Sequence, residues 1–311
     1  MVTTAGASGN ERVQDPMKAN ETTSEGIAYG MLITVYMADK SHFDKLWAFA
    51  QAHTSGGLMS WHIDASGNVL DPHSASDADE DMAWALVMAD KQWPGGNYLA
   101  AAKTMIGNIK SQDINSSNNV KDGNYVANSN HPDYAAPDYY KVFATIGADS
   151  SWNSIYDAEY MQLSGAQNTS TGLIPDSTGG STFGFDACRA PWRLGLDYCW
   201  NGSSSAKTFL SPMVAEFLQI SQNGANVKNI KIPMPVAGGA GQYSSGAITG
   251  PAAIAAMMNA SNQTFVDGSW SYLYSVIVND TTNTPNYFSG TLGMISLLAL
   301  SGNFVDYTNP P

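Results

Sequence analysis

A chain of 311 residues that is 43% hydrophobic can bury a large core, and its formal net charge of −13 argues against nucleic acids and anionic membranes as partners. Charged residues make up only 13% of the chain, and no run of about 18 apolar residues is present to cross a membrane. Because no linker or charge block divides the sequence, we expect a single domain over residues 1–311 that acts on an uncharged substrate.

Residues 1–24 are polar and contain Gly6, Gly9 and Pro16, which predicts an irregular segment. Two kinds of helix then alternate along the chain. Helices rich in Ala, Gly and Met are expected to be buried on all sides, and amphipathic helices are expected to cover them. The first kind is predicted at residues 25–38, 79–93, 137–147, 186–200, 246–260 and 287–301, and the second kind at residues 43–54, 97–113, 151–167, 205–220 and 263–278.

Six buried helices separated by amphipathic helices predict an all-α (α/α)6 barrel. In that fold the outer helices return the chain, so the inner helices run in one direction and their N-termini lie on one rim. Only five outer helices are predicted, and the first one, expected before Glu25, is missing. An α-solenoid is the alternative, although the repeats of a solenoid are usually more alike.

Glu25 is the first acid at the start of a predicted inner helix. Thr23 and Ser24 are good N-cap residues, and the helix dipole favours a glutamate in the first turn whether or not it has a function. Gly26 and Gly30 each cost about 1 kcal/mol relative to alanine, so a ligand or a neighbouring helix is expected to come close. These glycines favour Glu25 as the proton donor of a glycosidase.

Asp77 lies in a run of four acids within five residues, SDADED at 76–81. Either Ser76 or Asp77 caps the helix and the other acids are solvated, or one acid reaches a cleft near Glu25. A second negative charge there would raise the pKa of the glutamate and keep it protonated near neutrality. A calcium site is a further alternative, but the spacing is not that of an EF-hand loop.

Asp186 is the third acid at the start of an inner helix, and it could be the ionised partner that hydrolysis of a glycosidic bond needs beside a protonated acid. Arg189, one turn later, can pair with a carboxylate and keep it ionised and oriented. The alternative is a buried ion pair that joins two inner helices. Arg193 is the better candidate for that structural role.

Aromatic residues in the loops and helix starts of the expected rim bear on the substrate, because the flat C–H faces of sugars stack on aromatic rings. They are Trp61, Tyr125, Tyr134, Tyr139 and Tyr287. Each of them alone could equally be an ordinary core residue. Together they predict a cleft for several sugar rings, and therefore an endo-acting enzyme on a polymer. Short strands are plausible in the same loops, for example at residues 60–63.

No cofactor or metal site is expected. Cys188 and Cys199 are 11 residues apart on one predicted helix, which places their α-carbons about 16 Å apart, too far for a disulfide. The five histidines are scattered without a zinc-like spacing.

Four short motifs and a longer C-terminal segment resemble glycoside hydrolase family 8. They are SEGIAYGM at 24–31, GLMSWHID at 57–64, SDADED at 76–81, DACR at 186–189 and the segment at 287–304. The resemblance runs from about Arg12 to Phe304 in order. It implies an (α/α)6 barrel and an inverting endo-hydrolase of β-1,4-glucans, xylan, mixed-linkage glucan or chitosan.

The resemblance also implies roles for individual residues. It makes Glu25 the general acid and Asp186 the general base that activates water, with Arg189 beside it. It makes Asp77 the acid that holds the central sugar and helps to position water. Trp61 and Tyr134 match contacts around that sugar, whereas Tyr125 lies in a loop of uncertain alignment.

The Asp-Ala-Asp-Glu-Asp and Trp-His-Ile-Asp runs resemble the cellulase branch of the family more than the xylanases. We therefore expect an endo-β-1,4-glucanase (cellulase) that is also active on mixed-linkage β-glucan. The alternatives are a xylanase or chitosanase of the same family and a non-catalytic glycan-binding barrel. A polysaccharide lyase fits less well, because a cleft built on carboxylates suits acidic polymers poorly. A secreted or extracellular location is expected, although Met1 opens no signal-peptide pattern.

The sequence departs from the family pattern at the N-terminus, because residues 1–24 do not supply the helix that usually precedes the Glu25 motif. Either the barrel has eleven helices, or a partner chain covers the gap. An exposed side of inner helices would be an apolar patch of the kind that drives dimerisation, so a homodimer is one expectation.

Overall fold

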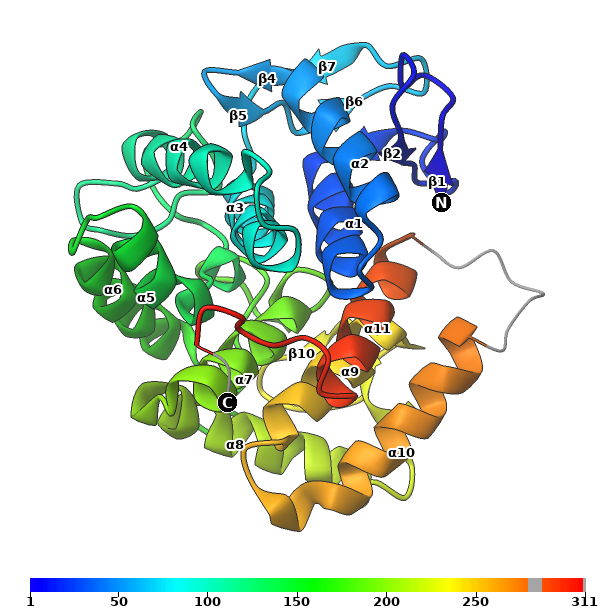
Figure 1. Cartoon of the computed structure of the whole chain (residues 1–311). Helices are drawn as coiled ribbons and strands as arrows, with labels where there is room; N and C mark the ends of the chain where they lie inside the picture. The colour runs from blue at the N-terminus through cyan, green and yellow to red at the C-terminus, as the bar shows by residue number, and fades with distance from the viewer. Residues whose placement is uncertain (279–286, 310–311) are drawn as a thin grey trace.

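The computed structural model describes residues 1–278 and 287–309 and shows a ring of inner helices surrounded by outer helices (Figure 1). The (α/α)6 barrel predicted from the sequence is confirmed. The inner helices are α1 (Ser24–Tyr36), α3 (Ser76–Gln92), α5 (Pro137–Ile146), α7 (Ala190–Asn201), α9 (Gly246–Ala256) and α11 (Tyr287–Leu300). The outer helices are α2 (Lys40–Ala52), α4 (Tyr98–Gln112), α6 (Trp152–Ala166), α8 (Ser204–Ile220) and α10 (Gln263–Leu273).

The two kinds of helix differ in burial as their sequences predict. Every residue of α9 is buried, and so is every residue of α3 from Ser76 to Ala89. In the outer helix α8, burial follows the spacing of one helix face and includes Phe209, Met213 and Phe217. The ring closes because α11, the last helix, packs against both α9 and α1.

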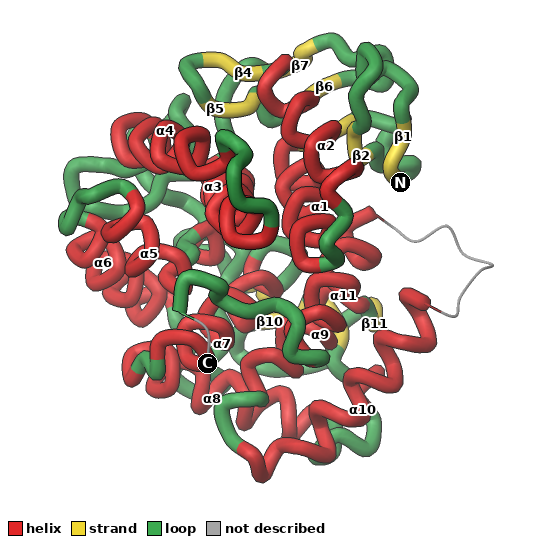
Figure 2. The backbone as a smooth tube through the Cα atoms, viewed as in Figure 1, coloured by secondary structure: helices red, strands yellow, loops and turns green. Residues whose placement is uncertain are grey.

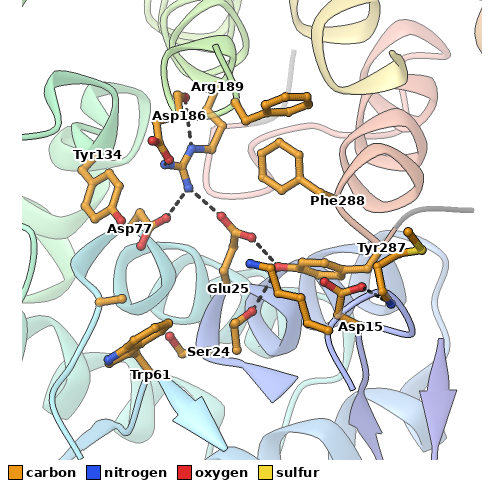
Figure 3. A pocket seen from close by; sticks show the side chains of 15 residues that line it. Asp15, Ser24, Glu25, Trp61, Asp77, Tyr134, Asp186, Arg189, Tyr287 and Phe288 are labelled. Atoms are coloured by element: carbon orange, nitrogen blue, oxygen red, sulfur yellow. Dashed lines mark hydrogen bonds and ion pairs between the residues drawn. The ribbon is translucent and has the colours of Figure 1, made fainter. Parts of the chain in front are cut away.

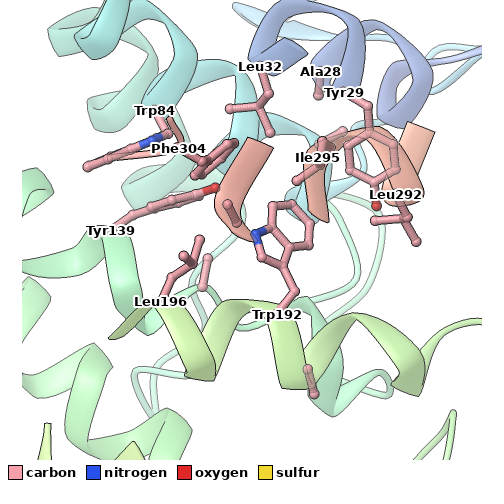
Figure 4. Close-up of a cluster of buried hydrophobic side chains, with 14 of the residues drawn as sticks. Ala28, Tyr29, Leu32, Trp84, Tyr139, Trp192, Leu196, Leu292, Ile295 and Phe304 are labelled. Carbon is pink, nitrogen blue, oxygen red and sulfur yellow. The ribbon is translucent and has the colours of Figure 1, made fainter. Parts of the chain in front are cut away.

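Aromatic side chains fill the centre of the ring (Figure 4). Trp84 of α3 stacks on Tyr139 of α5 with ring centroids 4.6 Å apart, and Trp200 of α7 stacks on Phe304 after α11 at 5.9 Å. Trp192 packs edge-on against Phe304. These contacts join helices that are distant in sequence, and they place Tyr139 in the core, so its predicted position on the active rim is wrong.

The strands are short pieces in the connections between helices (Figure 2). Strand β6 pairs with both β3 and β7, which holds the Trp61 segment beside the N-terminus of α1, and it confirms the short strand expected near residues 60–63. The strands are β1 (Val2–Thr3), β2 (Arg12–Val13), β3 (Thr22–Thr23), β4 (Thr54–Ser55), β5 (Leu58–Met59), β6 (His62–Ile63), β7 (Val69–Asp71), β8 (Thr182–Phe183), β9 (Lys231–Ile232), β10 (Met234–Pro235) and β11 (Tyr243–Ser244).

The segment before α1 contains no helix, as predicted, but it is held in place by Arg12. The buried guanidinium donates hydrogen bonds to the carbonyl oxygens of Ala5, Asn20 and Ala65 and to the Thr22 hydroxyl, at 2.6 to 2.9 Å. The neighbouring Val13 packs on the glycine face of α1. The N-terminal segment therefore covers part of α1. That a partner chain replaces a missing outer helix stays a prediction.

Several helix ends differ from the prediction by a few residues, and three of them have a visible local cause. The fourth inner helix was expected to start at residue 186, but a 3-10 turn, η2 (Ala187–Arg189), precedes α7, which starts with Pro191 in its first turn. Proline lacks the N–H that a helix interior needs and favours the first helical positions. Helix α9 ends at Ala256 because Asn259 caps a new short turn, and the last turn of the helix predicted at 263–278 is a π-helix, Tyr274–Val278.

Cys188 is buried and Cys199 is exposed, and both thiols are free, as expected from their spacing. Within the described residues, no helix combines the length and the apolar character that crossing a membrane requires.

Candidate active site

A pocket of about 510 Å³ opens where the N-terminal ends of α1, α3 and α11 meet the η2 turn (Figure 3). This volume is within the usual range of small-molecule sites. The three acids predicted from the sequence, Glu25, Asp77 and Asp186, all line it. The expectation that the inner helices present their N-terminal ends on one rim is therefore consistent with the position of the pocket.

Arg189 is at the centre of the site. Its Nη1 atom lies 2.6 Å from both Glu25 Oε2 and Asp77 Oδ2, and its Nη2 atom lies 2.7 Å from Asp133 Oδ2 and 3.2 Å from Asp186 Oδ1. Burial would lower the pKa of this guanidinium, but the carboxylates around it, led by Asp133 and Asp77, raise it well above its usual value. One permanent cation thus brings four carboxyl groups together.

Glu25 lies in the first turn of α1, whose N-cap is Thr23. The Glu25 Oε2 atom faces Arg189, and Oε1 accepts a hydrogen bond from the hydroxyl of Tyr287 at the start of α11. The side chain is only 18% exposed. Burial raises the pKa of Glu25 to about 7; Arg189 opposes this shift, and Asp77 adds to it. The predicted effect of Asp77 is therefore present, but burial is the larger cause.

Asp186 is placed differently from the prediction, because it precedes the η2 turn and does not begin an inner helix. The Oδ1 atom of Asp176 accepts the backbone N–H groups of Gly184, Asp186 and Ala187 at 2.8, 3.3 and 2.9 Å and so holds the start of this turn. The Asp186 carboxylate is therefore left for Arg189 and the cleft, with 45% of its side chain exposed. This position gives water ready access to it.

The acid run after Asp77 is buried, so the alternative of solvated acids is wrong. Asp81 forms a two-point ion pair with Arg193 at 2.9 and 3.0 Å, which confirms the structural role expected for that arginine. Glu80 accepts a hydrogen bond from the Tyr140 hydroxyl at 3.0 Å. Burial raises the pKa of Asp79 well above its usual value, and the neighbouring Asp113 adds to the shift. These acids join inner helices and loops behind the site.

One carboxylate oxygen of Asp77 has no partner among the described residues. Its Oδ2 atom binds Arg189, whereas Oδ1 is buried and has no hydrogen-bond partner among the described residues. Buried carboxylate oxygens are normally hydrogen-bonded. The Oδ1 atom is therefore an acceptor that the described residues leave unused.

Asp133 is a site residue that the sequence analysis missed. It lies in a 3-10 turn, η1 (Pro132–Tyr134), between α4 and α5, and accepts hydrogen bonds from Nε and Nη2 of Arg189. Burial raises its pKa to about 6, and Arg189 opposes the shift. Its position directly before Tyr134 is the only hint in the sequence, and an acid in a loop is too common to carry a prediction.

The aromatic residues divide into those that line the pocket and those that do not. Trp61, Tyr134 and Tyr287 line it. The Tyr134 ring lies over the Arg189 guanidinium at 4.9 Å. Tyr125 is 54% exposed and packs against His73 outside this pocket, so its role in substrate binding stays a prediction.

The pocket continues beyond Tyr287 into a wall that was not predicted. Phe185 and Phe288 pack edge-on there with ring centroids 6.1 Å apart. The pocket is also lined by Met17 and Lys18, which come from the N-terminal turn that Arg12 holds. Trp61 and Tyr134 lie toward the other end of the pocket, with Glu25 between the two groups of aromatic residues (Figure 3).

Over the described part of the chain, no group of three or more His, Cys, Asp or Glu residues could hold a metal ion. The centre of the carboxylate cluster holds Arg189. The chemistry available here is proton donation from Glu25, whose pKa is raised, beside further carboxyl groups that contact the same arginine.

The sequence matches a known protein family over nearly its whole length: residues 1–302 correspond to Glycosyl hydrolases family 8. The chain belongs to this family. Two curated relatives agree with that assignment. Endoglucanase C of Ruminiclostridium cellulolyticum is 36% identical over 323 residues, which cover 97% of this chain and 68% of that protein. The Beta-glucanase of Niallia circulans is 30% identical over 328 residues, which cover 92% of this chain and 78% of that protein.

The fold agrees with the same family. The apo Beta-1,3-1,4-glucanase from Paenibacillus sp. X4 superimposes with a TM-score of 0.88 at 28% identity, and the match covers 97% of this chain and 88% of that one. The family 8 resemblance of the sequence motifs is thus confirmed, and the chain is a glycoside hydrolase.

Proposed function

We propose that this family 8 enzyme cleaves internal β-1,4-glucosidic bonds of cellulose-type glucans and of mixed-linkage β-glucan, with inversion of the anomeric carbon. The observation that carries the proposal is the pair of carboxyl groups on Arg189. Glu25 is buried with its pKa raised to about 7, and Asp186 is 45% exposed to water. A glycosidase needs one protonated and one ionised carboxyl group across the bond it cleaves.

In the proposed reaction, Glu25 gives its proton to the glycosidic oxygen as the bond between that oxygen and the anomeric carbon breaks. A water molecule attacks the anomeric carbon from the opposite face, and Asp186 takes a proton from this water. Asp77 lines the same pocket and is 2.6 Å from Arg189, and its role in this proposal is to hold the central sugar and help to position the water. Glu25 ends ionised and Asp186 protonated, and exchange with solvent restores both.

The separation of the two carboxyl groups decides between inversion and retention. Glu25 and Asp186 contact different terminal nitrogens of the Arg189 guanidinium, at 2.6 and 3.2 Å. Inverting enzymes have separations of about 6.5–9.5 Å and retaining enzymes of about 5–5.5 Å. The anomer of the first product therefore tests the mechanism: inversion of a β-linkage releases the α-anomer, which proton NMR distinguishes before mutarotation.

The substrate class rests on the relatives and on the aromatic walls of the pocket. Proteins named endoglucanase and Beta-glucanase are 30–36% identical to this chain over more than nine-tenths of it. A xylan-type substrate is the second candidate, because a relative named reducing-end xylose-releasing exo-oligoxylanase is 28% identical over 58% of the chain. Chitosan and a binding-only barrel remain as outcomes of the test.

The test is release of reducing sugar from carboxymethylcellulose, barley β-glucan, xylan and chitosan by the wild type and by Glu25→Gln. Glu216→Gln is the matched control, since Glu216 lies in the outer helix α8 and does not line the pocket. Release from the two glucans that is lost only in Glu25→Gln supports the proposal. Release from xylan or chitosan alone would contradict the proposed glucan substrate. Binding of a polymer without release of sugar would contradict the proposed catalytic activity.

Two further proposals concern the setting of the enzyme. A polymeric substrate favours action outside the cell, which fractionation of the producing cells tests. A homodimer that covers the N-terminal side of the barrel is tested by sedimentation at high concentration. A single species of 33.1 kDa would rule the dimer out.

A further inference from the structure

Both carboxyl oxygens of Glu25 have partners, and the two partners differ in kind. Oε2 is 2.6 Å from Arg189 Nη1, and Oε1 accepts the hydroxyl hydrogen of Tyr287. The Tyr287 oxygen is also 3.1 Å from Thr23 Oγ1, which accepts the backbone N–H of Gly26 at 3.2 Å. A line of hydrogen bonds therefore runs from the start of α1 through the start of α11 to Glu25.

Only the hydrogen bonds on the Tyr287 side of Glu25 can reverse their direction. A guanidinium can only donate hydrogen bonds, whereas each hydroxyl of threonine and tyrosine can either donate or accept. When Glu25 is ionised, Thr23 donates to Tyr287 and Tyr287 donates to Glu25. When Glu25 carries a proton on Oε1, that proton points to Tyr287, and Tyr287 donates to Thr23.

We propose that Thr23 and Tyr287 form a reversible hydrogen-bond chain that holds the acid proton on Oε1 of Glu25 and stabilises the carboxylate left when this proton is transferred. The inference rests on the proposed function, in which Glu25 is the general acid. In the transfer, the Glu25 O–H bond breaks and a bond forms between that proton and the glycosidic oxygen. The Tyr287 hydroxyl then turns to donate to Oε1. Tyr287 and Thr23 are thus positioning residues, and they act through Glu25.

The packing of the two helices is adapted to this contact. A Cβ atom at Gly26 would be 3.1 Å from the Tyr287 ring, closer than rings and methyl groups normally pack, so glycine gives the ring its room. Tyr287 is buried, which limits replacement of its hydroxyl by water. Aspartate would cap α1 as well as threonine does, but an ionised aspartate cannot donate to Tyr287. The hydroxyl of Thr23 therefore does more than cap the helix.

The acidity of Glu25 depends on groups from every element around it. Arg189 and the Tyr287 hydrogen bond lower its pKa, whereas Asp77 and Asp186 raise it. Tyr29 on its own helix and Tyr134 on the η1 turn also face its charge, and Asp15 and Lys18 line the same pocket. Because the Tyr287 hydroxyl favours the ionised form, its removal raises the Glu25 pKa, and activity then persists to higher pH at a lower maximum.

The experiment compares the wild type with Tyr287→Phe, Thr23→Val and Thr23→Ser in two measurements. The first is kcat on barley β-glucan as a function of pH. The second is the pKa of the Glu25 carboxyl from carbon NMR, which is assignable because the chain has only six glutamates and Glu25→Gln removes one signal. The thermal midpoint of each variant reports the loss of the helix cap separately.

We expect Tyr287→Phe to lower kcat about 10-fold or more, less than the roughly 100-fold or greater loss when a general acid is removed. Its basic limb and its Glu25 pKa both move to higher pH. Thr23→Val is expected to move the basic limb and the Glu25 pKa in the same direction by a smaller amount. Thr23→Ser keeps a hydroxyl group at this position, so its basic limb and its Glu25 pKa are expected to match those of the wild type.

An unchanged Glu25 pKa and basic limb in Tyr287→Phe overturns the inference, and so does a Thr23→Ser variant that behaves like Thr23→Val. If Tyr287→Phe does not fold, the two Thr23 variants decide the question. If the wild type releases no sugar from any polymer, the proposed function fails, whereas the NMR comparison still tests the hydrogen-bond chain by itself.

Discussion

Replacing each of two helical glycines by alanine is expected to change stability in opposite directions, although the chemical change is the same. A Cβ atom at Gly30 in α1 would lie 2.9 Å from Val13 Cγ2 and 2.9 Å from Leu46 Cδ1. Both neighbours are buried, and the Val13 side chain is β-branched and therefore stiff. A Cβ atom at Gly107 in the outer helix α4 would meet nothing within 4 Å.

The magnitudes follow from these surroundings. Alanine gains about 1 kcal/mol over glycine in a helix interior, whereas a methyl group forced into a packed core costs about 1–3 kcal/mol. Gly107→Ala is therefore expected to stabilise the protein by about 1 kcal/mol. Gly30→Ala is expected to destabilise it by about 1 kcal/mol after the helix gain is subtracted. In a protein of this size, about 1 kcal/mol corresponds to roughly 2 °C in the unfolding midpoint.

The assay is thermal and urea unfolding of both variants beside the wild type, with kcat on β-glucan measured on the same samples. Gly30 lies on the helix that carries Glu25, so Gly30→Ala is also expected to lower kcat, while Gly107→Ala keeps it. A Gly30→Ala variant that is stabilised as much as Gly107→Ala would refute the reasoning. In that case the contacts of α1 with Val13 and Leu46 would be loose enough to accept a methyl group.

Three other predictions concern charge and substrate contact. With the Glu25 pKa raised to about 7, kcat/KM should fall above pH 7 by about tenfold per pH unit, because the acid must be protonated; a basic limb near pH 5 would contradict this. Burial raises the pKa of Glu159 to about 8, so this group lowers stability as pH rises from about 4.5 to 8, at about 1.4 kcal/mol per pKa unit. Glu159→Gln keeps an oxygen for the Val120 N–H, and unfolding titrations should show a flatter pH dependence than in the wild type. Trp61→Ala should cost about 2 kcal/mol of binding, seen as roughly 30-fold in kcat/KM on long glucans, and an unchanged KM would show that this ring does not carry a sugar.

The helices could be predicted from the sequence because each one repeats a local pattern. The inner helices lack a polar face and the outer helices have one. The spacing of apolar residues and the composition of each segment were therefore sufficient to predict the two kinds of helix. The start of α7 was not predictable in the same way. The inner helix was expected to begin at Asp186, but η2 precedes α7, and Asp176, ten residues earlier in the chain, accepts three backbone N–H groups at the start of this turn. Hydrogen bonds supplied from a preceding loop leave no periodic signal.

The site was predictable where its residues begin inner helices, because a barrel brings such positions together. Glu25 and Asp77 meet at Arg189 for that reason. Asp133 could not be found by the same argument, since it lies in a 3-10 turn that only the folded chain places beside Arg189. Tyr125 and Tyr134 come from one loop, and only Tyr134, which the family resemblance placed beside the central sugar, lines the pocket.

The burial of the acid run was the hardest feature to predict. Four acids in five residues normally indicate a solvated surface. The sequence does not show which groups form hydrogen bonds or ion pairs with these acids. The partners of Asp81 and Glu80 are Arg193 and Tyr140, which follow at sequence separations of 112 and 60 residues. Burial of a charge is a property of such distant pairs, so local composition does not reveal it.

The contact between Thr23 and Tyr287 spans 264 residues and joins the first inner helix to the last one. During synthesis the acid-bearing helix leaves the ribosome early, whereas the tyrosine that holds its carboxyl group emerges only with α11. A growing chain therefore carries Glu25 without a finished site for most of its translation. Hydrolysis therefore requires the chain to be translated through α11. A fragment that ends before α11 keeps all three predicted acids but lacks the helix that closes the barrel onto α1.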